Sequence, residues 1–205
     1  MDISILGSSG EGDVMTAEIA EAKRALRQII QRRSKLLPAS YFQEAGRLIS
    51  ERACRTNEYQ LASTVLGFAS MENEPDTSEF LRHALREKRL ALPVCRDSGM
   101  MEAREIQSKQ DLVPGKYGIW EPAPHCPLVP VEEIQFALIP CVSCDITGKR
   151  LGHGGGYYDR YLAAYSKTAA LVCPAALLSD RIPVDAYDIA IPFVITESAV
   201  YRNGH

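Results

Sequence analysis

The segment FALIPCVSCDITGKRLGHGGGYYDRYL, residues 136–162, decides the fold class of this chain. Its apolar start, residues 136–144, is typical of a buried strand. Glycines then fill four of the five positions 152–156, directly before a Tyr-Tyr-Asp-Arg helix opening. Glycine lacks a Cβ and can adopt positive φ, so the N–H groups of this loop can surround an anion, and the following helix adds its positive dipole end. We therefore expect a strand, a phosphate-holding loop and a helix.

Charged residues flank this loop in an order that favours a phosphate site. Lys149, Arg150 and Arg160 supply positive charge, and Asp159 can hold a cation. The segment is not a Walker A loop, and it lacks the acidic residue about twenty positions on that a dinucleotide fingerprint requires. The alternative is a strand-to-helix turn that binds nothing. The succession of strand, basic pair, glycines, aromatic pair and acidic residue argues against that alternative.

Strands and helices alternate along the rest of the chain. The expected strands lie at residues 64–69, 90–94, 101–106, 136–144, 169–173 and 193–196, and the expected helices at 16–34, 40–54, 77–88 and from the glycine loop to about residue 165. Such alternation predicts the α/β class, as a single three-layer α/β/α domain with a mixed, mostly parallel sheet. A proline-rich segment at 114–130 is expected to be an ordered surface excursion.

Length and composition fit one globular domain. The 205 residues are 46% apolar and 24% charged, which is ordinary for such a domain. We expect residues 1–15 to be a disordered lead-in, with Met15 as an alternative start, and residues 16–205 to form the domain. We also expect a monomer.

The charge pattern bears on the kind of partner. A net charge of -3 is too small to attract a polyanion through its bulk field. The one basic cluster, residues 24–35, has alanine and leucine interleaved at helical spacing, which favours a solvated helix face. No apolar run is long enough to span a membrane. We therefore expect neither nucleic acid nor a membrane among the partners.

Six cysteines lie in apolar surroundings with no secretory signal before them, which favours a reduced, cytoplasmic protein. They are Cys54, Cys95, Cys126, Cys141, Cys144 and Cys173. Cys141 and Cys144 have the spacing of a redox or zinc pair, yet no second pair follows at a zinc-site spacing. We interpret them as packing residues, because buried free cysteines behave as small hydrophobes.

Three segments carry a shared pattern: KRALR at residues 23–27, SMENEPDT at 70–77 and the glycine segment at 145–162. Together they resemble the 5-formyltetrahydrofolate cyclo-ligase family, also called methenyltetrahydrofolate synthetases. The first is similar to the family's amino-terminal Lys-x-x-x-Arg pair, the second to its acidic folate-contacting turn, and the third to its hallmark. The resemblance spans about residues 20–197.

The resemblance implies an enzyme that uses ATP and Mg²⁺ to convert 5-formyltetrahydrofolate into 5,10-methenyltetrahydrofolate, with release of ADP and phosphate. A formamide oxygen is a poor leaving group, so its phosphorylation would give an electrophilic imidate that N10 attacks before phosphate departs. Such a protein mainly holds two substrates in line and neutralises charge. The implied partners are these two small molecules, with Mg²⁺ as the cofactor.

The resemblance also assigns roles to individual residues. Arg150 and Tyr158 are implied to be catalytic. The implied ATP-binding residues are Lys23, Arg27, Arg150, Leu151, Gly152, His153, Gly154, Gly155, Gly156, Tyr157 and Tyr158. The implied folate-binding residues are Glu74, Met71, Tyr117 and Tyr157, and the implied Mg²⁺ ligands are Asp159 and Asp188.

Each assignment has a structural alternative. Lys23 and Arg27 lie at i and i+4, so one helix face offers both cations, but such a pair can also be solvated. Glu74 and Asp188 can be polar turn residues, and Asp159 is favoured in a first helical turn by the dipole alone. The implied methionine and tyrosine contacts can be ordinary packing.

Two rival functions fit the same residues. One is a non-catalytic folate- or nucleotide-binding module on the same scaffold, which would bind both ligands without turnover. The other is a kinase or ligase with the same ATP chemistry and another acceptor. Calorimetry separates the first rival, and a substrate panel followed by ADP release separates the second.

Overall fold

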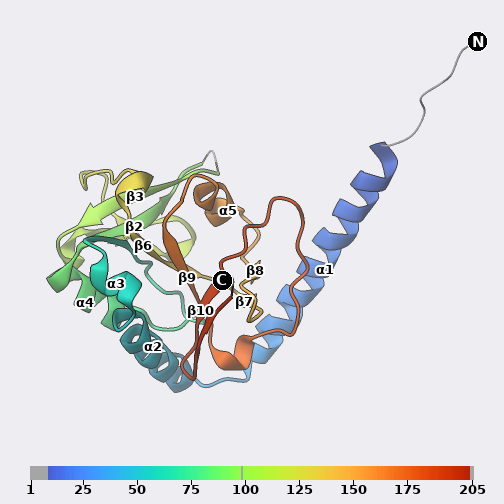
Figure 1. Ribbon diagram of the computed structural model, residues 1–205, viewed down its shortest axis with the longest axis horizontal. Helices are drawn as coiled ribbons and strands as arrows, with labels where there is room; N and C mark the ends of the chain where they lie inside the picture. Colours follow the sequence, from blue (N-terminus) through green and yellow to red (C-terminus); the bar gives the residue numbers. More distant parts are fainter. Residues whose placement is uncertain (1–8, 98, 204–205) are drawn as a thin grey trace, which may run out of the picture.

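A seven-stranded sheet organises the chain, with strands in the order β11-β10-β9-β6-β1-β2-β3 (Figure 1). The computed structural model describes residues 9–97 and 99–203, and the side chains of residues 9–14 and of Tyr117 lie outside the described part. The sheet strands are β1 Thr64–Leu66, β2 Arg89–Cys95, β3 Met101–Ile106, β6 Phe136–Pro140, β9 Thr168–Val172, β10 Phe193–Ile195 and β11 Val200–Arg202. Two small hairpins pair β4 Leu112–Pro114 with β5 Trp120–Pro122 and β7 Ser143–Cys144 with β8 Arg150–Leu151. The α-helices are α1 Ser9–Lys35, α2 Ala39–Cys54, α3 Asn57–Leu61, α4 Ser78–Glu87 and α5 Tyr157–Leu162.

The strand directions confirm the predicted mixed, mostly parallel sheet. The five inner strands run parallel to one another. Each edge strand runs antiparallel to its neighbour, β3 to β2 and β11 to β10. Strand β6 lies between β1 and β9 and is buried on both faces, which explains why its sequence reads as a continuous apolar run.

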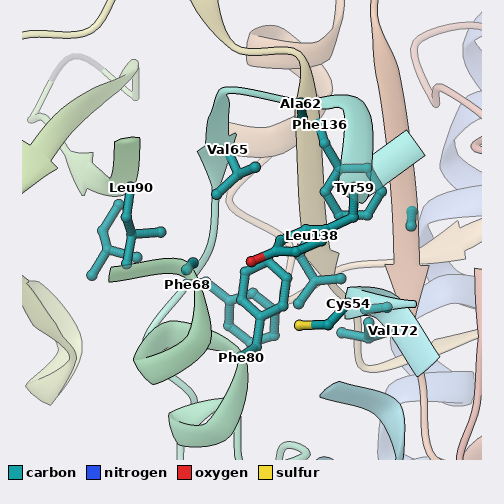
Figure 2. Close-up of a cluster of buried hydrophobic side chains, with 14 of the residues drawn as sticks. Cys54, Tyr59, Ala62, Val65, Phe68, Phe80, Leu90, Phe136, Leu138 and Val172 are labelled. Carbon is teal, nitrogen blue, oxygen red and sulfur yellow. The ribbon is translucent and has the colours of Figure 1, made fainter. Parts of the chain in front are cut away.

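Alternate residues of the central strands feed two apolar cores, one on each face of the sheet. From β6, Phe136 and Leu138 enter the first core with Tyr59 of α3 and Phe80 of α4 (Figure 2). The intervening residues of β6 enter the second core, which contains Ile30 of α1 and Leu162 of α5. Side chains alternate in this way because a strand has a period of two. Helices therefore cover both faces, which confirms the three-layer prediction.

The amino-terminal helix α1 begins at Ser9, earlier than the predicted residue 16, and projects from the body of the protein (Figure 1). Its carboxyl-terminal part is anchored, since Ile30 is buried and Arg33 Nη1 donates to Leu178 O at 3.0 Å. The expected lead-in thus overlaps the helix from Ser9 on, and residues 1–8 lie outside the described part. Long as α1 is, neither it nor any other described helix is apolar enough to cross a bilayer.

The predicted strand at residues 136–144 is wrong in one respect, because the chain leaves the main sheet after Pro140. The apolar run continues in β7, which pairs with β8 in a separate hairpin. Asp145 holds the turn of this hairpin, since its Oδ1 accepts hydrogen bonds from Thr147 N at 2.9 Å and Lys149 N at 3.2 Å. The β7–β8 hairpin thus follows the central strand β6 and leads into the glycine loop, which is followed by α5.

Several short elements were not predicted, namely α3, the two hairpins and β11. Each spans only two to five residues, and elements of this length depend on tertiary contacts more than on local propensity. The β4–β5 hairpin overlaps the proline-rich segment, which is ordered as expected. Helix α5 ends at Leu162 and not near residue 165.

Candidate active site

A cavity of about 1070 Å³ opens at the carboxyl ends of the central parallel strands, the edge where α/β sheets commonly bind ligands. All residues with an implied site role line it, except Tyr117, whose side chain lies outside the described part. The lining residues of this set are Lys23, Arg27, Met71, Glu74, Arg150, Leu151, Gly152, His153, Gly154, Gly155, Gly156, Tyr157, Tyr158, Asp159 and Asp188. They come from α1, the turn before α4, the β8–α5 segment and the loop before β10, so the fold brings four distant segments to one cavity.

The glycine loop at 152–156 has backbone donors available for a ligand. No N–H group of these residues donates to a protein acceptor within the described chain. Gly154 has φ +102° and Gly156 has φ +64°, conformations that favour glycine. Gly155, which was expected to share this conformation, does not have positive φ. Unpaired N–H groups in such a turn form a concavity suited to an anion.

The helix after the loop contributes less than predicted. Helix α5 has only six residues, and few aligned peptide units give a weak dipole. Side chains must therefore supply most of the positive charge. Arg27 of α1 does so directly, because its Nε donates to Gly152 O at 2.7 Å and its guanidinium lies against Gly154.

Lys23, one turn before Arg27 on α1, is held by two carboxylates. Its Nζ lies 2.7 Å from Asp185 Oδ2 and also contacts Asp188 Oδ2. Burial lowers the pKa of Lys23, but the hydrogen bonds to Asp185 and Asp188 outweigh that effect and raise it above its usual value. The hydrogen bond from Lys23 lowers the pKa of Asp185 despite partial burial. Both groups are therefore charged at neutral pH.

Arg150 of β8 forms the second charged pair of the cavity. Its side chain is 5% exposed, and its Nη2 lies 2.6 Å from Asp159 Oδ1. The guanidinium carbon lies 5.6 Å from the ring centroid of Tyr158, and the buried Nε has no partner in the described structure. Burial raises the pKa of Tyr158, as does the charge of Glu74. Tyr158 is therefore a neutral phenol that can donate a hydrogen bond but cannot act as a base near neutrality.

Glu74 and His153 connect the acidic turn to the glycine loop. Glu74 is 7% exposed, and its Oε2 accepts a hydrogen bond from Met71 N at 2.9 Å. Its Oε1 lies 3.1 Å from His153 Nε2. A buried carboxylate needs such partners, and this one takes one from each of two segments of the site. The turn and the loop are thereby joined at a single side chain.

Tyr157 and Arg160 close one side of the loop. The Arg160 guanidinium carbon lies 5.6 Å from the ring centroid of Tyr157, and Arg160 Nη2 donates to Gly99 O and to Gly155 O, each at 2.6 Å. Arg160 was expected to flank a phosphate. In the structure the Arg160 guanidinium instead donates hydrogen bonds to these two backbone carbonyls. It thereby holds the glycine loop against the β2–β3 connection.

The two implied Mg²⁺ ligands fit a hard cation that is shared with a substrate. Asp159 and Asp188 each use one carboxylate oxygen in the contacts with Arg150 and Lys23. The described groups of three potential ligand atoms within 4.8 Å of one another include neither residue. Mg²⁺ takes one or two carboxylates together with phosphate oxygens and water, so a dedicated protein cage is not required.

Sequence reasoning missed several residues of this cavity. Asp185 is the clearest, because it lies three residues before Asp188 and contacts Lys23; the Asp-x-x-Asp spacing was a usable signal. Trp120, Met101 and Cys95 also line the cavity. Cys95 and Met101 lie at the β2–β3 edge of the main sheet, and Trp120 lies in the separate β4–β5 hairpin. How that hairpin packs against the sheet edge is not revealed by local sequence.

Comparison with known proteins places the chain among a group of related enzymes. A family model described as the 5-formyltetrahydrofolate cyclo-ligase family matches residues 19–197. The chain is 32% identical over 181 residues to a protein of Escherichia coli K12 named 5-formyltetrahydrofolate cyclo-ligase, covering 85% of this chain and 99% of that one. It is 28% identical to a mitochondrial protein of the same name from Arabidopsis thaliana, covering 89% and 76% of the two chains.

Solved structures agree with this grouping. The chain superposes on a 5,10-methenyltetrahydrofolate synthetase of Aquifex aeolicus with a TM-score of 0.80 and 27% identity, covering 89% of this chain and 94% of that one. A Mycoplasma pneumoniae structure with the same enzyme name gives a TM-score of 0.67 at 20% identity, covering 85% and 98%, and supports the fold alone.

Proposed function

The chain belongs to the 5-formyltetrahydrofolate cyclo-ligase family, and from that premise we propose that it converts 5-formyltetrahydrofolate into 5,10-methenyltetrahydrofolate at the cost of one ATP. The observation that carries the proposal is the contact between Glu74 and His153. It joins the acidic turn, which resembles a folate site, to the glycine loop, which resembles a phosphate site. Two substrates that react with each other need this adjacency.

The ATP phosphates are proposed to lie between α1 and the glycine loop. Lys23, Arg27 and Arg150 surround this region, and the loop adds N–H donors that have no protein acceptor within the described chain. Charge-assisted hydrogen bonds from such groups are the usual means of holding phosphate. Arg150 Nε, which is buried and has no partner in the described chain, is a donor in need of an acceptor.

Mg²⁺ is proposed to be held by Asp159 and Asp188 together with the phosphates, and when bound it neutralises phosphate charge. Both carboxylates now contact cations that belong to the proposed phosphate site. When the magnesium–nucleotide complex binds, Lys23 and Arg150 would turn to phosphate oxygens while the carboxylates turn to the metal. Each of these four side chains would thus have a partner of opposite charge in both states, which limits the desolvation penalty.

The proposed chemistry has two steps. The formyl oxygen attacks the terminal phosphorus of ATP, the bond to ADP breaks, and a phosphorylated imidate forms. N10 then attacks the formyl carbon, phosphate leaves with the former formyl oxygen, and the N10 proton passes to solvent. In this proposal Arg150 would stabilise charge on the transferred phosphoryl group, and the neutral Tyr158, whose ring lies beside the Arg150 guanidinium, would donate to the same oxygens.

The folate is proposed to occupy the apolar end of the cavity. Glu74 would accept hydrogen bonds from the pterin amino and ring N–H groups, and Met71 and Tyr157 would contact its flat rings. The contact between Tyr117 and the folate stays a prediction from the sequence. Trp120, at the rim of the same cavity, is 54% exposed, and an exposed indole beside an apolar cavity is a surface on which an aromatic ring can stack.

The proposal also includes the cellular location, the oligomeric state and the partners of the protein. A cytoplasmic location and a monomeric state are proposed, as expected from the sequence, and so is the absence of a nucleic-acid partner. The rival readings remain a binding module and an ATP-dependent enzyme with another acceptor. A panel of acceptors distinguishes all three.

In that panel, ADP release from ATP and Mg²⁺ is measured with 5-formyltetrahydrofolate, 10-formyltetrahydrofolate, tetrahydrofolate, simple formamides and no acceptor. We expect release chiefly with the 5-formyl folate, because the proposed site presents a formyl group on N5 to the ATP phosphates with N10 as the internal nucleophile. In 10-formyltetrahydrofolate these two positions are exchanged, and the other acceptors lack either the formyl group or the internal nucleophile. Calorimetric binding of ATP and folate without ADP release would favour the binding module. Faster release with an unrelated acceptor would favour the other enzyme.

The single tryptophan offers a direct test of folate position. We expect 5-formyltetrahydrofolate to change the fluorescence of Trp120, whereas ATP alone should change it little, because ATP is proposed to bind at the opposite end near Lys23. The measurement is a fluorescence titration corrected for absorption by the folate with free N-acetyltryptophanamide. A Trp120→Phe variant should lose the signal. A response to ATP alone that equals the folate response would contradict the proposed arrangement.

A further inference from the structure

Three cysteines that lie far apart in the sequence meet beneath the glycine-loop hairpin. Cys141 follows β6, Cys144 lies in β7 and Cys173 follows β9. Their sulfur atoms all lie within 4.8 Å of one another, and the three residues are 5%, 0% and 0% exposed. None of them lines the substrate cavity. The sheet thus adds a third thiol to a pair that the sequence alone suggested was mere packing.

The geometry suits a bound ion. A thiolate-bound metal with a metal–sulfur distance of about 2.3 Å holds its sulfurs roughly 4 Å apart. The present spacing is within 1 Å of that value, so small side-chain rotations would complete the site. We propose that Cys141, Cys144 and Cys173 bind one Cu(I) ion. This metal site is separate from the proposed catalytic function of the protein.

Coordination number favours Cu(I) over zinc. Thiolate sulfur selects soft ions, chiefly Cu(I) and zinc, but structural zinc almost always has four ligands. The described cluster offers three. The nearest carboxylate in sequence, Asp145, is already used by Thr147, Lys149 and Ile182. Trigonal coordination by three sulfurs needs no further ligand.

The thiols of this cluster have only weak partners that a metal could replace. Cys141 Sγ donates to Val172 O at 3.3 Å, and Cys173 Sγ donates to Pro174 O at 3.5 Å. A cysteine binds a metal as the thiolate, so Cu(I) binding would break these S–H contacts and release the thiol protons to solvent.

The position of the cluster indicates what the ion would do. Cys141 and Cys173 lie at the ends of neighbouring parallel strands, and Cys144 lies in the hairpin that carries the glycine loop. An ion bonded to all three would fasten that hairpin to the sheet. Because it would bind the folded state, it should raise thermal stability, and tighter binding should raise it further.

The test uses the full reduced chain under anaerobic conditions. Cu(I) is titrated in the presence of the chromophoric ligand bicinchoninate, and weakly held metal is removed with glutathione. We expect one Cu(I) per chain, a higher unfolding temperature and three sulfur neighbours by X-ray absorption. Each of the variants Cys141→Ala, Cys144→Ala and Cys173→Ala should weaken binding at least tenfold. Cys54→Ala is the matched control, since Cys54 is also buried but lies in the other core, and it should leave binding unchanged.

Because the site is closed, a parallel sample is unfolded and refolded with Cu(I) before the same measurements. Failure to retain one equivalent in both samples would overturn the proposal. So would equal loss of binding in Cys54→Ala, a two-sulfur site, or zinc held in preference to Cu(I). Enzyme turnover is not a readout here, so failure of this site and failure of the proposed catalytic function are separate results.

Discussion

Replacement of Arg150 by alanine is expected to lower the turnover number with ATP by about 10²–10³-fold while folate binding persists. The reason is the position of the guanidinium, which is buried at the start of the glycine loop and holds Asp159. Loss of this charge would remove a donor from the transferred phosphoryl group. The measurement is initial rate against ATP concentration, with folate affinity followed separately by calorimetry.

This substitution also affects folding, which must be separated from catalysis. Removing Arg150 leaves Asp159 without its partner, a loss of about 1–3 kcal/mol for a partly buried acceptor. Urea denaturation measures that cost, and the assays are run where the variant is folded. Arg89→Ala is the control, because Arg89 forms ion pairs with Glu105 and Glu133 and does not line the cavity. Unchanged kinetics in Arg150→Ala would remove this residue from the site.

Replacement of Glu74 by glutamine is expected to raise the KM for 5-formyltetrahydrofolate by about 10–100-fold, the worth of a charged hydrogen bond of about 1.5–3 kcal/mol. The KM for ATP should change little. The side-chain oxygen of glutamine can still accept from Met71 N, so the turn should persist and the unfolding free energy should change only slightly. The measurement is steady-state kinetics with each substrate varied in turn.

The matched control for this variant is Glu79→Gln. Glu79 lies on α4 in an exposed ion pair with Arg82, away from the cavity, so its kinetics should match those of the parent. If Glu74→Gln leaves folate use intact, the carboxylate is only a structural element of the turn. An equal loss in both KM values would mean that the variant disturbs the loop through His153.

The centre of the sheet could be predicted because its central strands are largely buried and read as apolar runs between helical segments. The hairpin from Ser143 to Leu151 could not, since the apolar run of β6 continues into β7 without a break. The boundary depends on pairing with β8, a tertiary event. In the same way, Cys173 joins Cys141 only because β9 lies beside β6.

The residues of the candidate site could be predicted from the family resemblance, but their contacts could not. Lys23 contacts Asp188 and Arg150 contacts Asp159 in the structure, contacts that the sequence did not predict; the phosphate roles of both cations stay predictions. The contact between His153 and Glu74 was not predicted either, and the role of His153 in ATP binding stays a prediction. Which charges pair across a cavity follows from the folded geometry of distant segments, and no local pattern encodes it.

The central claim is that this cavity couples ATP cleavage to closure of the methenyl ring. The most direct test is a reaction of purified protein with Mg²⁺, ATP and 5-formyltetrahydrofolate. The absorbance of the methenyl product and the amount of ADP are measured in the same reaction. We expect both products to appear in equal amounts and neither when ATP or the folate is omitted. Ring closure at full rate without ATP, or ADP formed by well-folded protein with no methenyl product, would contradict the account.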